Sequence, residues 1–70
     1  MDEIKTGVYR HYKGDFYEVI EFAQHTETSE ELVIYKSIKS GRIWARPKIM
    51  FLEKIVLEGR EIPRFSYLGK

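Results

Sequence analysis

The stretch LVIYKSIKSGRIWARP, residues Leu32–Pro47, decides the fold because it has the pattern of a β-hairpin. Two runs rich in β-branched and aromatic residues flank Ser40-Gly41, and glycine supplies the positive φ that a two-residue hairpin turn requires. A turn of this length pairs Tyr35 with Arg46 and Ser37 with Trp44. A loop of three or four residues would shift these pairs without changing which residues of one strand share a face.

Side-chain alternation along the two strands divides the hairpin into two faces. One face is aliphatic and collects Ile34, Ile38, Ile43 and Ala45. The other face is mixed and collects Val33, Tyr35, Ser37, Trp44 and Arg46. We expect the aliphatic face to lie in the core and the mixed face to form a partly exposed platform that carries the single Trp of the chain.

The composition is typical of a small globular domain. Its 43% hydrophobic and 33% charged residues differ from the signature of a disordered chain, and 70 residues suffice for one domain with one small core. The absence of Cys excludes disulfides and thiolate metal sites and fits a reducing compartment. No apolar run exceeds four residues, so we expect a cytoplasmic protein with neither a membrane span nor a membrane partner.

The charge distribution is more informative than the formal net charge of +1. Residues 15–31 contain six acidic residues and no Lys or Arg, so the rest of the chain carries +7 (12 basic minus 5 acidic residues). Arg42, Arg46 and Lys48 form a basic patch around the second hairpin strand, which Lys13, Arg60 and Arg64 could join. These charges also fit ordinary solvated faces that keep a small protein soluble.

The N-terminal half predicts two more strands. Gly7–Tyr12 and Phe16–Ala23 have strand-like compositions and are joined by a turn at Lys13-Gly14-Asp15. The alternation slips at Val19-Ile20, which indicates either a strand covered on both faces or a β-bulge. The polar residues 24–31 predict a loop.

The segment after the hairpin has two interpretations. Pro47–Phe51 fits one helical or 3₁₀ turn, followed by a short strand at Lys54–Leu57 that ends at Glu58-Gly59. The alternative is a single helix from Pro47 to Glu58. We favour the turn and strand because Ile55-Val56-Leu57 is β-like. Pro63 restricts any later strand to a sheet edge, and we expect residues 1–5 and 66–70 to be frayed.

These elements together predict an all-β fold, a small SH3-like barrel of about five strands with one short helical or 3₁₀ turn. A closed barrel would leave no exposed edge strands, which an open sheet of this size would have. We expect residues 1–70 to form one domain that is a monomer, although a homodimer is compatible with the sequence.

Three strings spread over most of the chain resemble a known family. The strings GVYRHYKGDFYEVIEFAQHTET, IWARPKIMF and IPRF are similar to the small bacterial family known as domain of unknown function 1653. The resemblance extends from about Gly7 to Phe65. It implies a compact, mostly β domain that is found alone, and it implies no activity, cofactor or site residues.

The mixed face of the hairpin is the candidate binding surface. Trp44 beside Tyr35 and Arg46 could form an aromatic shelf with a fixed guanidinium, suited to stacking a base or holding a phosphate or carboxylate. Alternatively, Trp44 covers the mouth of the barrel, and Arg46 stacks on Tyr35 or pairs with Glu27. The candidate ligand-binding residues are Tyr35, Trp44, Arg46, His11, His25, Glu27, Arg64 and Lys13.

Metal binding and catalysis are weaker hypotheses. Two His without Cys make a poor metal site, and no nucleophile motif or Gly-rich phosphate loop is present. We therefore predict a non-enzymatic module that binds an anionic ligand, a nucleic acid or a nucleotide, without a cofactor or a metal. The alternatives are a protein- or peptide-interaction module that uses the same face, and a small enzyme in which His11 or His25 acts as a base oriented by Glu27.

Overall fold

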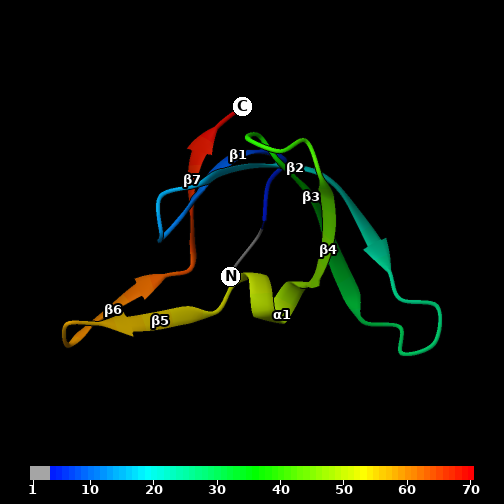
Figure 1. The fold of residues 1–70 in the computed structure, drawn as a ribbon. Helices are drawn as coiled ribbons and strands as arrows, with labels where there is room; N and C mark the ends of the chain where they lie inside the picture. Colours follow the sequence, from blue (N-terminus) through cyan, green and yellow to red (C-terminus); the bar gives the residue numbers. More distant parts are fainter. Residues whose placement is uncertain (1–3) are drawn as a thin grey trace.

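The computed structural model describes residues 4–70 and shows seven strands and one short helix (Figure 1). The main sheet is antiparallel throughout and has the order β4-β3-β2-β1-β7. Its strands are β1 (Gly7–His11), β2 (Phe16–Gln24), β3 (Glu31–Ser37), β4 (Ile43–Pro47) and β7 (Phe65–Gly69). The helix α1 (Lys48–Phe51) leads into a separate two-stranded sheet of β5 (Lys54–Leu57) and β6 (Arg60–Pro63).

The fold is all-β with a short helical turn, but it is not the closed SH3-like barrel that the sequence suggested. The main sheet curves over α1 and stays open on that side (Figure 1), with β4 and β7 as its two edges. The physical reason is that β5 and β6 pair with each other instead of joining the main sheet. These two strands could have closed a barrel, but they form a hairpin that projects to the side of the main sheet (Figure 1).

The predicted hairpin forms, but its loop has four residues instead of two. The backbone N–H of Ser37 donates to the Arg42 carbonyl at 2.8 Å, and Gly41, with φ +76°, donates to the Ser37 carbonyl at 2.7 Å. Tyr35 therefore pairs with Trp44, and Val33 pairs with Arg46, two positions away from the predicted register. A shift of two preserves the faces of both strands.

The aliphatic face of this hairpin is outside, which corrects the predicted core. Ile38 and Ile43 are 54% and 59% exposed, and Ala45 is also exposed. The concave face instead buries Val33 and Tyr35, against which the side chains from α1 and β7 pack. The buried hydrophobic residues are Ile4, Tyr9, Val19, Val33, Tyr35, Phe51 and Phe65.

Aromatic rings make up most of this core. Phe51 of α1 and Phe65 of β7 stack with their ring centroids 4.2 Å apart and their planes 3° from parallel. Phe51 meets Tyr9 and Tyr35 edge to face, at 5.4 Å and 5.6 Å. Rings contribute large buried areas, so a few aromatic side chains can fill the core of so short a chain.

The irregularity predicted in the second strand is a β-bulge. The pairing of β2 with β3 shifts between Val19 and Glu21, which leaves Ile20 without a partner. Val19 is 1% exposed and lies opposite Tyr35, whereas Phe22 lies opposite Val33. The extra residue therefore returns Phe22 to the concave face after the alternation has slipped.

The turn-and-strand interpretation of residues 47–58 is confirmed, and the single helix is wrong. Pro47 precedes α1 with φ −56°, which suits the start of a helical turn. The β5–β6 hairpin turns at Glu58 and Gly59, whose φ values are +52° and +77°. Both strands of this hairpin are edges, so Pro63 at the end of β6 interrupts no central ladder.

Both ends of the described chain are ordered parts of the fold, contrary to the predicted fraying. Ile4 is buried, and β7 pairs with β1 through residues up to Gly69. Gly7 lies at this junction with φ +133°, where a Cβ atom would stand 2.8 Å from the Gly69 carbonyl oxygen. The expectation for residues 1–3 falls outside the described residues. No helix between residues 4 and 70 has the length and apolar character needed to cross a membrane.

Candidate functional site

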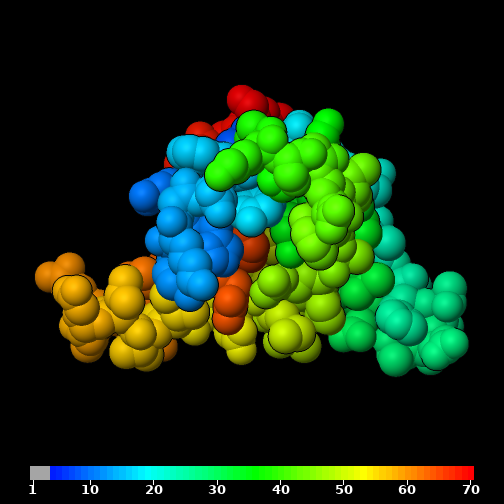
Figure 2. Space-filling model, viewed as in Figure 1, coloured from blue at the N-terminus to red at the C-terminus, as the bar shows by residue number. Residues whose placement is uncertain are grey.

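A surface pocket of about 290 Å³ lies on the concave side of the sheet, where the mixed face of the hairpin was predicted to bind a ligand. We call it the cationic pocket; its lining residues are Tyr17, Tyr35, Ser37, Ser40, Trp44 and Arg46. In the space-filling view the surface is hollowed between the β1–β2 turn and the β3–β4 hairpin, with the start of β7 visible beneath (Figure 2).

The sheet register brings the rings of this pocket together. Tyr17 lies opposite Ser37, and Tyr35 lies opposite Trp44, so all four side chains share the concave face. Trp44 is 46% exposed and is therefore not part of the core. The Arg42 guanidinium lies over the indole with its central carbon 5.6 Å from the ring centroid, a cation–π arrangement.

Among residues 4–70, Arg46 is held in place without a carboxylate partner. Its Nε donates to the Tyr35 hydroxyl at 3.1 Å, and its guanidinium carbon is 5.9 Å from the Phe65 ring centroid. The ion pairs found in residues 4–70 are Lys48 with Glu31 and Arg64 with Glu53, so the predicted alternative of an Arg46–Glu27 pair does not occur. The guanidinium is oriented by neutral groups and keeps its charge available.

Two serines form the loop side of the pocket. The Ser37 hydroxyl accepts a hydrogen bond from the Ser40 backbone N–H at 3.1 Å, and the Ser40 hydroxyl accepts one from the Arg42 N–H at 3.2 Å. Each hydroxyl uses its oxygen as the acceptor in these bonds, so its own O–H can still donate. The loop thus adds donors to the positive charge of Arg42 and Arg46.

His11 lies beside this pocket among aromatic rings. Its ring is 5.0 Å from Phe65 and 6.2 Å from Tyr17 between centroids, and its Nδ1 accepts the Lys13 backbone N–H at 3.2 Å. Burial lowers the pKa of His11, and the nearby cations Arg64, Lys13 and Arg46 lower it further, against the opposite effect of Asp15. Both effects favour the neutral imidazole, and His11 experiences the positive potential around the pocket.

Comparison with known proteins agrees with this fold. Residues 7–67 match the family described as "Protein of unknown function (DUF1653)". The chain belongs to the DUF1653 family. It is also similar to the crystal structure of a DUF1653 protein from Bordetella bronchiseptica, with 33% identity and a TM-score of 0.86 over 96% of this chain and 90% of that chain. No curated protein matches the sequence.

The family resemblance noted in the sequence is thus confirmed, and the DUF1653 fold determines where the remaining predicted residues lie. Arg64 sits between β6 and β7, where its Nη2 bonds Glu53 Oε1 at 2.9 Å. Its Nε is buried and has no hydrogen-bond partner among residues 4–70. Lys13 is exposed in the β1–β2 turn, with Nζ 5.9 Å from the centroid of the Tyr12 ring.

His25 and Glu27 lie away from the cationic pocket in this DUF1653 structure. They belong to the β2–β3 loop, where His25 Nδ1 accepts the Glu27 backbone N–H at 3.1 Å. The pocket is at the other end of the same two strands, beside Tyr17, about 20 Å away at about 3.3 Å per strand residue. The fold therefore separates His11 from Glu27, whereas His25 and Glu27 share one loop. Within residues 4–70, no three His, Cys, Asp or Glu side chains are placed to hold a metal ion.

Sequence reasoning omitted Tyr17, Ser37, Ser40 and Arg42 from the binding residues. Tyr17 comes from a strand that precedes the hairpin, and its position depends on the β2–β3 register. Arg42 was assigned only to the basic patch, although it lies two residues before Trp44 and directly precedes the same strand. That spacing, which places both side chains on one face of a strand, is the signal that could have identified it.

Proposed function

We propose that this DUF1653 protein is a non-enzymatic module that binds an anionic ligand, a single-stranded nucleic acid or a nucleotide, in the cationic pocket. The observation that carries the proposal is the environment of Arg46. Its guanidinium is fixed by the Tyr35 hydroxyl beside a half-exposed indole, and among residues 4–70 it has no carboxylate partner.

The chemistry of the pocket suits a phosphate next to a ring. A guanidinium offers a planar set of donors that matches two phosphate oxygens, and the Tyr35 bond leaves both of its terminal nitrogens for this purpose. The indole of Trp44 provides a surface on which a base can stack. A volume of about 290 Å³ is at the lower limit of small-molecule sites, so the pocket would hold about one nucleotide unit.

Binding by this pocket would be weak and sensitive to salt. Arg42 and Arg46 lie two residues before and two residues after Trp44, and each can neutralise one phosphate of a bound single-stranded nucleic acid. For two phosphates on a single strand, raising the salt from about 50 to about 200 mM lowers the affinity about sevenfold. A protein without cysteine that binds such a ligand also fits a cytoplasmic location.

The fluorescence of Trp44 tests the proposal because it is the single Trp of the chain. Titration with an oligouridylate of about eight nucleotides should quench the emission, with the salt dependence given above. Arg46→Gln should weaken binding at least about fivefold, and Arg46→Lys should weaken it less because the charge remains. Arg60→Gln, an exposed arginine on the projecting hairpin, is the matched control and should leave binding unchanged.

Two results would overturn the proposal. One is the absence of quenching by oligonucleotides and nucleotides at low salt. The other is an affinity that does not change with salt or with Arg46→Gln. Salt-independent quenching by peptides would instead support a peptide-interaction module that uses the same residues.

A further inference from the structure

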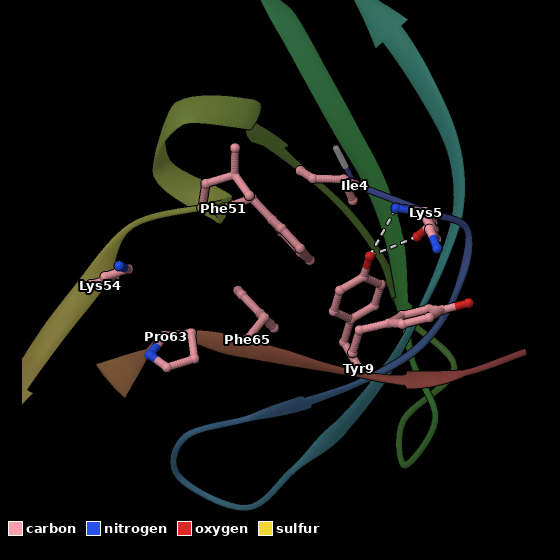
Figure 3. A pocket seen from close by; sticks show the side chains of 9 residues that line it. Ile4, Lys5, Tyr9, Phe51, Lys54, Pro63 and Phe65 are labelled. Carbon is pink, nitrogen blue, oxygen red and sulfur yellow. Dashed lines mark hydrogen bonds between the residues drawn. The ribbon is translucent and has the colours of Figure 1, made fainter. Parts of the chain in front are cut away.

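A second pocket, of about 270 Å³, is lined by both rings of the stacked Phe51–Phe65 pair (Figure 3). We call it the apolar pocket. Its lining residues are Ile4, Lys5, Tyr9, Phe51, Leu52, Lys54, Pro63, Phe65 and Tyr67. The innermost of these, Ile4, Tyr9, Phe51 and Phe65, are all buried members of the core.

The walls of the apolar pocket are fixed by direct contacts. The Tyr9 hydroxyl accepts the Lys5 backbone N–H at 2.9 Å and donates to the Lys5 carbonyl at 2.8 Å, as Figure 3 shows. The Tyr9 ring also meets Phe51 edge to face and lies 5.1 Å from the Tyr67 ring. Because these groups are already held by each other, a ligand would enter a preformed space and would order few side chains.

Among residues 4–70, the charged groups that line this pocket are both cationic. Lys5 and Lys54 lie on opposite sides of it (Figure 3), and no acidic residue of the described range belongs to its lining. Lys5 Nζ is 5.8 Å from the centroid of the Tyr67 ring, so this ammonium group is next to the aromatic wall. Neither lysine has a carboxylate within 4 Å in the part of the chain that the structure describes.

We propose that the apolar pocket is a second binding site, for a small aromatic carboxylate with its ring against Phe51, Phe65 and Tyr9 and its charge between the two lysines. An engineered apolar cavity of about 150 Å³ holds benzene, so 270 Å³ has room for a ring and a short acidic chain. Aromatic walls favour a ring, and the paired ammonium groups favour an anion over a neutral or cationic analogue. This site is independent of the cationic pocket.

Backbone amide NMR titration with 3-phenylpropionate tests the inference. We expect saturable shifts at Tyr9, Phe51, Phe65 and Tyr67, with a dissociation constant of about a few millimolar or lower for a ligand of this size. The neutral analogue 3-phenylpropanamide has nearly the same shape and should bind at least about fivefold more weakly, because it lacks the charge.

Charge-removing variants separate the contributions of ring and carboxylate. The double variant Lys5→Gln/Lys54→Gln should reduce the affinity for the carboxylate to that for the amide and leave amide binding unchanged. Both lysines are exposed, so this variant should fold normally. Lys39→Gln, in the exposed β3–β4 loop, is the matched control and should change neither affinity.

Three outcomes would contradict the proposal. They are equal binding of the acid and the amide, no saturable shifts up to about 20 mM ligand, and shifts confined to the residues of the cationic pocket. The last result would place the carboxylate at Arg46 and would leave the first proposed function standing, so failure of one proposal can be distinguished from failure of the other.

Discussion

The cationic and apolar pockets have nearly equal volumes but differ in which side chains are held in place. The Phe51–Phe65 stack contacts Tyr9 of one pocket and Tyr35 of the other. In the cationic pocket a guanidinium is fixed by a side-chain hydrogen bond beside an exposed indole. In the apolar pocket the rings are fixed, and the charges stand on flexible lysines at the rim.

The difference shows how one curved sheet can offer two kinds of site. Phe51 of α1 contacts Tyr9 of the apolar pocket and Tyr35 of the cationic pocket, and Phe65 of β7 stacks on Phe51. The cationic pocket takes its charge from Arg46 of the edge strand β4, and the apolar pocket takes its rings from α1, β1 and β7. Changes to the shared stack should therefore affect both pockets, whereas changes to the hydroxyl groups should affect one.

Removing the shared stack should have the largest effect. Phe65→Ala deletes a ring that is 8% exposed and packs against Phe51, Tyr35 and His11. We expect a loss of about 3–5 kcal/mol in the free energy of unfolding, measured in urea, and the loss of binding at both pockets. Phe16→Ala removes a ring that is 45% exposed and should lower the free energy of unfolding much less. Equal losses for the two variants would contradict a central role of Phe65 in the core.

The two tyrosine hydroxyls should differ in which pocket they support. Tyr9→Phe removes two hydrogen bonds to the Lys5 backbone, and we expect it to lower the free energy of unfolding by about 1–2 kcal/mol. Tyr35→Phe removes one bond to a guanidinium that can turn toward water, with an expected loss of about 0.5–1 kcal/mol.

The binding effects of these variants should be separate. Tyr35→Phe should weaken oligonucleotide binding and leave 3-phenylpropionate binding unchanged, whereas Tyr9→Phe should do the reverse. These affinities can be measured by Trp44 fluorescence and by amide NMR. If either variant weakens both ligands equally, the two pockets are not independent.

A smaller effect should appear in the pH dependence of stability. Because the pKa of His11 is lowered in the folded state, the unfolded chain binds a proton more readily once the pH falls below the ordinary value of 6.5. The contribution of His11 to stability is therefore fully present above pH 6.5 and is lost as the pH falls through its lowered pKa. Urea unfolding at several pH values should show this decline.

His11→Gln should reduce the decline, and His25→Gln, at the far end of the sheet, is the matched control. If both variants keep the full decline, the lowered pKa of His11 does not contribute to it.

The smallest expected effect connects His11 to its neighbouring pocket. Arg46 is one of the cations that lower the pKa of His11, so an anion bound at Arg46 should raise that pKa. The shift can be followed in the ring signals of His11 during NMR titrations with and without saturating nucleotide. A nucleotide that raises the pKa by the same amount in Arg46→Gln would contradict binding at this guanidinium.

Much of the local structure followed from the sequence because it depends on neighbouring residues. The glycine-containing hairpin and the helical turn after Pro47 came from propensity, and the bulge near Ile20 was one of two alternatives that the alternation left open. Trp44 and Arg46 were placed on one face with Tyr35. This assignment is correct although the predicted register was wrong by two residues, because side chains on a strand return to the same face every second residue. These conclusions required no knowledge of what packs against the strand.

The tertiary structure alone decided which face of the hairpin is inside, whether the sheet closes, and which candidate residues meet. Alternation makes the two faces of a strand distinct without saying which one will be covered. Here Phe51 and Phe65 arrive from segments beyond the hairpin and cover the face of Tyr35, which leaves Ile38 and Ile43 outside. His25 and Glu27 lie far from the pocket because they are at the opposite end of β2 and β3, and an extended strand keeps its two ends far apart. Long-range packing sets these outcomes, and a single sequence records it only indirectly.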